Sequence, residues 1–357
     1  MIHGVMSTSS VLTSSVLIRS LHEVVLFAKT GDRARAWAVA ALLVSAPLLG
    51  TQVAHAQQDA FPTQTLKLLV GFAPGGGADI VARLLAPKLA EQLKQSVVVE
   101  NRPGAGGNIA TDQLIKSAPD GHTLMLGTIG PLAVNQHLSR LAYNPITDTA
   151  AVSMAVVFSN VLVVQASSDI KILEDYLQQA RSPDTRLSFG SSGIGSAGHL
   201  SGELLKSAAN LNNQHVAYRG GAPAMNDLLG GALPSIFSSP SDAIQHIQSG
   251  RLRALATTGL KRSESLPQVP TIAESGFPGF EAINWYAFAV PARTPVEVVR
   301  KLNAAIVTAL NDPQVVAQIR KIGMEPAPTS PTEAARFFKA ESDKWGEVIR
   351  KAKIKSD

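Results

Sequence analysis

An alternation of two kinds of segment begins at Leu66, continues through most of the chain and limits the folds available to it. Short runs rich in apolar and β-branched residues alternate with stretches of helical periodicity, and Gly or Pro separates them. The first strand is predicted at Leu66–Phe72 and the first helix at Ala78–Leu93. Further strands are predicted at 97–100, 123–127, 161–165, 187–190, 214–218, 233–237, 253–257 and 285–290. This pattern is typical of a mainly parallel α/β sheet.

The length of the chain allows two domains, and the strand pattern indicates where the chain passes between them. Of the 357 residues, 45% are hydrophobic, so each domain can bury a core. A boundary is predicted where Ala155–Phe158 leads into Val161–Gln165, and a return crossing is predicted near Glu281–Tyr286. Two crossings would form a hinge. We therefore expect lobe 1 to contain residues 57–157 and 281–357, and lobe 2 to contain residues 158–280.

Two helix starts are predicted in the C-terminal part, which is mostly helical. The segments Thr294-Pro295-Val296-Glu297 and Ser330-Pro331-Thr332-Glu333 both match the capping box, with Pro at the first helical position. In each, the Thr or Ser side chain is expected to accept a hydrogen bond from a backbone N–H of the first turn. These helices are predicted to be structural.

The first 56 residues have the features of a secretory signal peptide. Arg33 and Arg35 precede the apolar run Ala36–Leu49, and Ala54-His55-Ala56 supplies the small residues for cleavage after Ala56. The run is too short to span a bilayer comfortably, so we expect a cleaved signal rather than a retained anchor. Because 56 residues are many for a signal peptide, we expect translation to start downstream of Met1.

Composition excludes several classes of protein. The formal net charge is only +5, with 17% charged and 5% aromatic residues, so neither a basic stripe nor a stacking platform for nucleic acid is predicted. The chain has no cysteine, which excludes disulfides, thiolate nucleophiles and sulfur-rich metal sites. The five histidines that follow residue 56 lack metal-binding spacing. We expect no nucleic-acid partner, no metal and no cofactor.

The most informative motif joins the first predicted strand to the first predicted helix. It reads Phe72-Ala73-Pro74-Gly75-Gly76-Gly77-Ala78-Asp79. Consecutive glycines let the backbone turn sharply and approach a ligand, and the free N–H groups of the following helix start attract an anion. A tight turn without a ligand is the alternative. The motif lacks the Gly-Lys-Ser/Thr ending of a P-loop.

A second glycine-rich segment, Ser191–His199, repeats this arrangement after the strand predicted at 187–190. Its glycines fit G-x-G-x-x-G, but the next strand ends in Tyr218-Arg219-Gly220 rather than in the acidic residue that binds a dinucleotide's ribose. Ile194 stands where a nucleophile elbow requires glycine, so Ser192 is not predicted to be a nucleophile. The segment therefore favours a second anion-binding turn over an enzyme site.

His199 and the segment after Ala217 each have two candidate roles. His199 follows Ser196 by three positions, so a Ser–His pair is conceivable, but no local acid would orient it, and a hydrogen bond that holds the loop is favoured. Tyr218 could cover a ligand or pack in the core. Ala222 could offer its backbone N–H to a ligand.

Taken in order, these segments resemble the Bug family, the periplasmic receptors associated with tripartite tricarboxylate transporters. The resemblance covers essentially the whole chain after residue 56. Its motifs are Val70–Asp79, Glu100–Gly107, Ser191–Leu200, Tyr218–Ala224, Gly250–Ala256 and Leu266–Thr271. It implies an α/β, two-lobed type II periplasmic binding protein with a hinge and a ligand cleft between the lobes. It also implies that the first and second glycine-rich loops hold a ligand carboxylate with backbone donors and helix dipoles.

The motifs and the resemblance together give fifteen candidate ligand-binding residues. They are Phe72, Ala73, Gly76, Gly77, Ala78, Asp79, Ser191, Ser192, Gly193, Gly195, Ser196, His199, Tyr218, Ala222 and Ser238. No catalytic or metal-binding residue is predicted. Trp285 and Tyr286 are candidates for the end of the site distal to the carboxylate.

Two departures from the family pattern affect the expected ligand. Ala78 stands where the family usually has Thr or Ser, so one hydroxyl is lost. Pro234 and Ser238 stand where the family often has Asp. Our hypothesis is that this loss disfavours an amino-acid ammonium and suits a simple carboxylate.

The expected function is therefore capture of a small organic acid in the periplasm, without catalysis. We expect a monomer whose closed form is recognised by the integral membrane subunits of a tripartite tricarboxylate-type transporter. A sensor that docks on a receptor kinase is the alternative. An enzyme acting on small carboxylates is a further alternative that the missing nucleophile, metal and cofactor signals disfavour.

Overall fold

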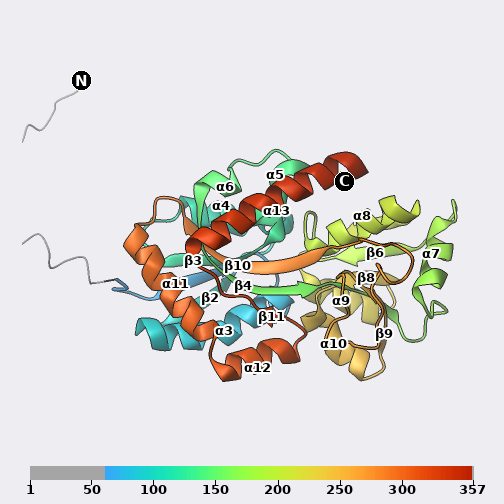
Figure 1. Cartoon of the computed structure of the whole chain (residues 1–357), viewed down its shortest axis with the longest axis horizontal. Coiled ribbons are helices and arrows are strands. Elements are labelled where there is room, and N and C mark those ends of the chain that lie inside the picture. Colours follow the sequence, from blue (N-terminus) through green and yellow to red (C-terminus); the bar gives the residue numbers. More distant parts are fainter. Residues whose placement is uncertain (1–60, 356–357) are drawn as a thin grey trace, which may run out of the picture. The chain divides into compact units, whose positions relative to one another are not determined.

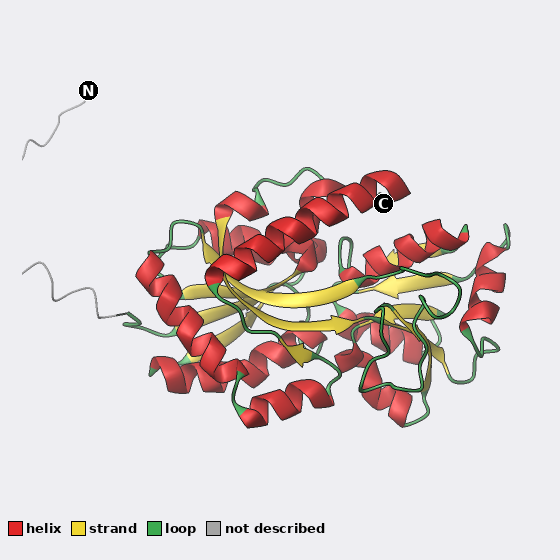
Figure 2. Ribbon diagram, viewed as in Figure 1, coloured by secondary structure: helices red, strands yellow, loops and turns green. Residues whose placement is uncertain are grey.

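Two β-sheets flanked by helices make up the computed structural model, which describes residues 61–355 (Figure 2). Sheet A has the strand order β11-β4-β10-β3-β1-β2, and sheet B has the order β7-β6-β8-β5-β9. The strands are β1 (Leu66–Val70), β2 (Val97–Asn101), β3 (Thr123–Thr128), β4 (Thr149–Ser159), β5 (Val161–Gln165), β6 (Ser188–Ser191), β7 (Gln214–Ala217), β8 (Ser235–Ser238), β9 (Leu252–Thr257), β10 (Ile283–Pro291) and β11 (Glu325–Pro326). The expected signal peptide, residues 1–56, lies outside the described residues.

The helices occupy the connections between these strands. They are α3 (Gly77–Leu93), η2 (Ala105–Gly107), α4 (Asn108–Lys116), η3 (Gly130–Val134), α5 (Asn135–Leu138), α6 (Pro145–Asp148), α7 (Leu173–Arg181), α8 (Ala197–Ala209), α9 (Gly221–Leu229), α10 (Pro240–Gln248), α11 (Val296–Leu310), α12 (Pro313–Lys321) and α13 (Pro331–Ala352). Within residues 61–355, no helix combines the length and the apolar character needed to cross a membrane.

Each sheet is built around the same βαβαβ unit. In sheet A, β2 and β3 pair in parallel on either side of β1, and α3 and α4 make the connections. In sheet B, β7 and β8 pair in parallel on either side of β6, and α8 and α9 make the connections. Ligands of such open sheets bind beyond the carboxyl ends of the strands. The loops that follow β1 and β6 are therefore equivalent positions in the two units.

Each sheet also contains antiparallel pairs, so it is mixed rather than mainly parallel as the sequence pattern predicts. β10 pairs antiparallel with both β3 and β4, and β5 pairs antiparallel with both β8 and β9. The long strands β4 and β10 lie side by side across the middle of the molecule (Figure 1). The strands by which the chain enters a sheet from the other sheet, β5 and β10, run opposite to its βαβ units. The strands by which it leaves, β4 and β9, run in the same sense as those units, and the alternation of sense gives the mixed pairing.

The chain passes between the sheets at two points that are hydrogen-bonded to each other. β4 leaves sheet A and reaches β5 of sheet B through Asn160, and the return runs from Thr258 to Ala282. The Asn160 N–H donates to the Thr258 hydroxyl (2.9 Å), and this hydroxyl donates to the Ala282 carbonyl (2.7 Å). The Asn284 amide donates to Asn160 Oδ1 (3.3 Å). The two connections therefore form one short buried hinge.

Helix α13 covers one face of sheet A through two tryptophans. Trp285 of β10 is fully buried and stacks on Phe338 with a ring-centroid distance of 5.2 Å. The indole N–H groups of Trp285 and Trp345 both donate to Glu341 Oε2, at 3.1 and 3.2 Å. The expectation that Trp285 contacts the ligand is wrong, because its side chain faces α13.

Only one of the two predicted capping boxes forms. Ser330 accepts a hydrogen bond from the Glu333 N–H, and the Glu333 carboxylate accepts one from the Ser330 N–H. At the other helix start, Pro295 occupies the cap position and the buried Thr294 hydroxyl has no hydrogen-bond partner among the described residues. α11 therefore begins one residue later than the motif predicts.

Replacing Glu341 with leucine is expected to lower the free energy of unfolding by about 2–4 kcal/mol, because two buried indole N–H groups lose their acceptor. Chemical denaturation of the purified protein measures the change. Glu347→Leu on the exposed side of α13 is the matched control, with an expected change within about 0.5 kcal/mol. Equal losses in the two variants would contradict the role assigned to Glu341.

Candidate ligand site between the two sheets

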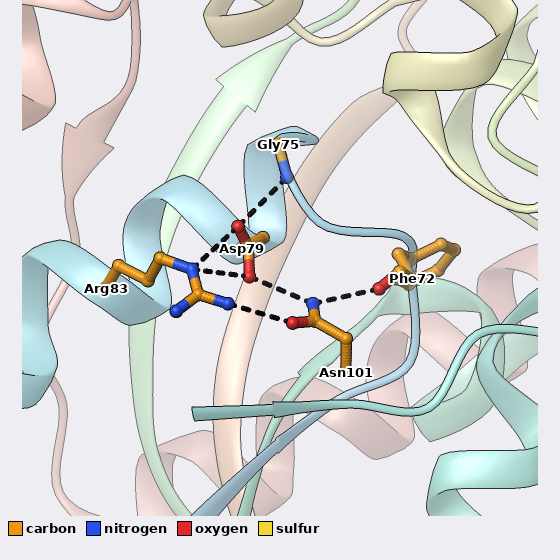
Figure 3. A network of polar contacts seen from close by, with 5 residues as sticks. All are labelled: Phe72, Gly75, Asp79, Arg83 and Asn101. Atoms are coloured by element: carbon orange, nitrogen blue, oxygen red, sulfur yellow. Dashed lines mark hydrogen bonds and ion pairs between the residues drawn. The ribbon is translucent and has the colours of Figure 1, made fainter. Parts of the chain in front are cut away.

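The loop after β1 is held in shape by a network around Asp79 (Figure 3). The Asp79 carboxylate accepts hydrogen bonds from the Gly75 N–H (2.9 Å), from Arg83 Nε (2.9 and 3.0 Å) and from Asn101 Nδ2 (2.9 Å). Asn101 also donates to the Phe72 carbonyl (3.0 Å). Burial raises the pKa of Asp79, but these hydrogen bonds and the Arg83 charge outweigh it and hold the pKa below 3.8. Asp79 therefore shapes the loop instead of facing a ligand.

The equivalent loop after β6 is held by the side chains of its own helix. The Ser196 hydroxyl caps α8 by accepting a hydrogen bond from the His199 N–H (3.3 Å), and Nδ1 of His199 accepts one from the Gly195 N–H (3.1 Å). Burial, followed by the nearby His215 and Lys206, lowers the pKa of His199 to about 3, so its ring is neutral. The ring thus supports the loop, and Ser196 uses its hydroxyl as a cap rather than in a Ser–His pair.

The loops of the two sheets meet directly. The Ala73 N–H donates to the Arg219 carbonyl (3.1 Å). A methyl group built on Gly106 would collide with the Ile194 carbonyl, and one built on Gly195 would collide with the Asn135 side chain. Both glycines have positive φ, 62° and 74°. This close approach of backbone to backbone explains why the loops are glycine-rich, and it indicates that the two sheets are in a closed arrangement.

A cavity of about 30 Å³ remains between these loops, enough for about two water molecules. Its wall contains these residues: Phe72, Gly76, Gly77, Ala78, Thr128, Asn160, Ser192, Ser196, Ala197, Gly198, Gly221, Ile236, Phe237, Ser238, Ser239, Asp242, Asn284 and Tyr286. They lie at the carboxyl ends of the parallel strands of both sheets and on the hinge. The cavity is therefore where the topology predicts a ligand site.

The cavity brings together seven of the fifteen predicted ligand-binding residues. These seven are Phe72, Gly76, Gly77, Ala78, Ser192, Ser196 and Ser238, whereas Ala73, Asp79, Ser191, Gly193, Gly195, His199, Tyr218 and Ala222 lie outside the wall. The Ser191 hydroxyl bonds Nε2 of His215 (2.7 Å) behind the loop. The Tyr218 hydroxyl donates to Asp227 (2.7 Å), and Ala222 packs near Gly75 and Gly76. These residues shape the two loops from behind or join them.

Several wall residues were not predicted from the sequence. Thr128 ends β3, opposite Tyr286 in the antiparallel register with β10. The Thr128 hydroxyl is buried and has no hydrogen-bond partner among the described residues, so it is available to a ligand. It offers a hydroxyl in the pocket although Ala78 lacks one. The available signal for Thr128 was its position directly after the strand predicted at 123–127. Asn160 and Asn284 had no signal beyond the predicted crossings.

Backbone dipoles supply the positive potential in the cavity. Four helices of nine or more residues begin at its wall, α3 at Gly77, α8 at Ala197, α9 at Gly221 and α10 at Pro240. None of the described residues in the wall is Lys, Arg or His. Helix N-termini stabilise negative charge through their free N–H groups and their dipoles. The cavity is thus suited to an anionic group without an ion pair.

One acid lies in this positive environment. The Asp242 carboxyl faces Gly221, and the Ser241 hydroxyl donates to it at 3.4 Å. Burial raises the pKa of Asp242 to about 6, although Ser239, Ser241 and the Gly77 N–H favour its ionised form. Burial, with the Asp242 charge, also raises the pKa of Tyr286. Asp242 therefore supplies an acid to the wall although Ser238 does not, and the hypothesis of a simple carboxylate stays a prediction.

The fold has two sheets flanked by helices, a hinge made of two connections, and a polar pocket between the loops of the two sheets. These features define the class of two-lobed solute-binding proteins. The family model described as tripartite tricarboxylate transporter family receptor matches residues 81–354, and the chain belongs to this family. Protein BugT of Bordetella pertussis is 36% identical over 301 residues, which cover 83% of this chain and 92% of BugT. The family consists of periplasmic binding proteins that work with tripartite transporters, and the chain is a receptor rather than an enzyme.

Solved structures agree with this assignment. The periplasmic binding protein BugD superposes with a TM-score of 0.80 at 32% identity, covering 83% of this chain and 99% of BugD. The R. palustris protein Rpa4515, solved with adipate, superposes with a TM-score of 0.80 at 36% identity, covering 83% of this chain and 99% of Rpa4515. The two-lobed periplasmic binding protein fold expected from the sequence is confirmed.

Proposed function

We propose that this receptor captures a small carboxylate-bearing molecule in the cavity between sheets A and B. The observation that carries the proposal is the start of α8 at Ala197, which lies at a cavity whose described wall has one acid, Asp242, and no cationic side chain. The buried, unpartnered Thr128 hydroxyl supports a ligand there as well. The adipate found with Rpa4515 is consistent with a carboxylate ligand.

Capture requires the lobes to open and close. The cavity holds only about two water molecules in this arrangement, so a ligand of four or more heavy atoms enters an opened cleft. We propose that residues 57–157 with 281–357 move against residues 158–280 by small dihedral changes near Asn160 and Thr258. The buried hydrogen bonds at these residues would keep the two connections together during the motion.

The closed form would then be delivered to the integral membrane subunits of a tripartite transporter. The family description supports this partner. We further propose that the chain is exported by a signal peptide cleaved after Ala56 and acts in the periplasm as a monomer. The hydrogen bond between Ala73 and Arg219 joins the two sheets in the closed arrangement, which supports the proposal that a membrane partner distinguishes the closed form from the open form.

A thermal-shift screen tests the proposed function. Purified protein is heated with monocarboxylates, dicarboxylates, aromatic acids and amino acids at millimolar concentration. A ligand that binds only the folded protein raises the melting temperature by mass action. At a ligand concentration of 100 times its Kd, the free energy of unfolding increases by about 2.7 kcal/mol. At least one carboxylate is expected to give a saturable shift. Matched alcohols or amides of the same size serve as controls, and a screen in which they match or exceed every carboxylate would reject the proposal.

A further inference from the structure

The inference concerns the end of the ligand that does not carry the proposed carboxylate, and it builds on the proposed function. Asp242 lies on the third residue of α10, and its carboxyl faces the start of α9 at Gly221. The backbone N–H of Gly77, at the start of α3, also favours the Asp242 anion. Three of the four helix starts are therefore already directed at a carboxylate that belongs to the protein.

The fourth helix start is left for the ligand. α8 begins at Ala197, next to the wall residues Ser192 and Gly198, and no acidic side chain other than Asp242 belongs to the described wall. A ligand carboxylate bound at the start of α8 would thus share a small cavity with the Asp242 carboxylate. Two carboxylates in so small a cavity repel each other, and none of the described wall residues is a Lys, Arg or His that would offset the repulsion.

The groups around Asp242 are arranged for hydrogen bonding. Ser239 and Ser241 lie 3.1 Å apart between their hydroxyl oxygens, and both hydroxyls lie near Gly77 and the Tyr286 hydroxyl. Thr128 lies next to Tyr286 across the strands and offers a hydroxyl that bonds no other described group. A carboxylate has about four acceptor positions, so a ligand donor can join the donors already present.

We propose that Asp242 is a specificity-determining residue that selects carboxylates carrying a hydrogen-bond donor, a hydroxyl or an ammonium, at the end distal to the carboxylate. A donor would pair with the resident carboxylate, whereas a second ligand carboxylate would be repelled and an apolar end would leave Asp242 without a partner from the ligand. Specificity of this kind combines an attractive contact with the wanted ligand and repulsion of the unwanted one.

The test uses ligands that differ only at one end. The four-carbon set is butyrate, 4-hydroxybutyrate, 4-aminobutyrate and succinate, and the six-carbon set is hexanoate, 6-hydroxyhexanoate, 6-aminohexanoate and adipate. Calorimetric titration at pH 7.5 is expected to give the donor-ended members at least about 10-fold lower Kd than the methyl-ended and dicarboxylate members in the set that fits. The hydroxyl and ammonium members show which donor is preferred.

Variants separate Asp242 from the rest of the pocket. In Asp242→Asn the donor preference is expected to fall below about 3-fold and dicarboxylate affinity to rise about 10-fold. Asp242→Ser is the second variant, and circular dichroism confirms that each is folded. Asp169→Asn, an exposed acid of lobe 2, is the control and should bind as the wild type does.

The outcomes distinguish this inference from the proposed function. If the wild type prefers the dicarboxylates, or if the folded Asp242 variants keep the wild-type ranking, Asp242 does not select the ligand, although capture of carboxylates stands. If neither these sets nor any other carboxylate binds, the proposed function fails and the selection by Asp242 fails with it.

Discussion

Gly77→Ala is expected to weaken ligand binding about 10- to 100-fold while leaving the protein folded, because overpacking a site by one methyl costs about 1–3 kcal/mol. The added Cβ would lie 2.5 Å from the Ser241 hydroxyl and 2.8 Å from the hydroxyls of Ser239 and Tyr286. The serines can rotate only by giving up their present contacts. Tyr286 is buried and packs edge-on against Phe158, with 5.0 Å between the ring centroids, so its ring has little freedom to move.

The fold should survive this change because two of the three close contacts, those with Ser239 and Ser241, lie between the lobes and are relieved when the cleft opens. Gly77 is the first residue of α3 and does not have positive φ, so alanine suits its backbone. Gly76→Ala is the matched control, since its Cβ would meet only ordinary contacts, at 3.5 Å or more from any atom. Calorimetry with the best carboxylate from the screen measures both variants. Equal affinities for Gly77→Ala and the wild type would show that the cleft does not close around the ligand as described.

Asp79→Asn is expected to lower the free energy of unfolding by about 1–3 kcal/mol at pH 7, because Arg83, Asn101 and the Gly75 N–H lose a shared charged acceptor. Ligand affinity should fall as well, by about 10-fold, although Asp79 does not belong to the cavity wall. The reason is that Asp79 fixes the loop whose glycines line the cavity (Figure 3). Asp112→Asn, which breaks the more exposed i,i+4 pair with Lys116, is the control, with an expected cost below about 0.5 kcal/mol.

The pH dependence of the free energy of unfolding shows how much the ionised Asp79 carboxylate contributes to stability. The folded-state pKa of Asp79 is lowered from 3.8, so the folded protein holds the ionised form more tightly than the unfolded chain does. The stabilisation is therefore complete above 3.8 and is lost as the pH falls through the folded-state pKa. Denaturation curves of wild type and Asp79→Asn should differ at neutral pH and converge in strong acid. A difference that does not change with pH would mean that the carboxylate charge is not what holds the loop.

Local sequence patterns were sufficient to predict most of the strands and the two glycine-rich loops after β1 and β6. Each of the nine predicted strands is observed within two residues at either end, because the short β-rich runs are bounded by Gly and Pro. The glycines after β1 and β6 indicated close backbone approach, and the helix starts that follow them indicated an anion site. A boundary was predicted after Ala155–Phe158, but strand β4 was not predicted as an element, because it is defined by pairing with residues more than a hundred positions away.

The side chains that complete the site depend on contacts between segments that are distant in the sequence. β10 is buried on both faces, so alternation along its sequence cannot tell which of Trp285 and Tyr286 faces the cavity. Register with β3 and packing of α13 place Tyr286 next to Thr128 and direct Trp285 toward Glu341. Asp242 resembles any acid in the first turn of a helix, where it offsets the dipole. Asp242 belongs to the pocket wall because the starts of α3 and α9, which are distant in sequence, both lie next to the start of α10.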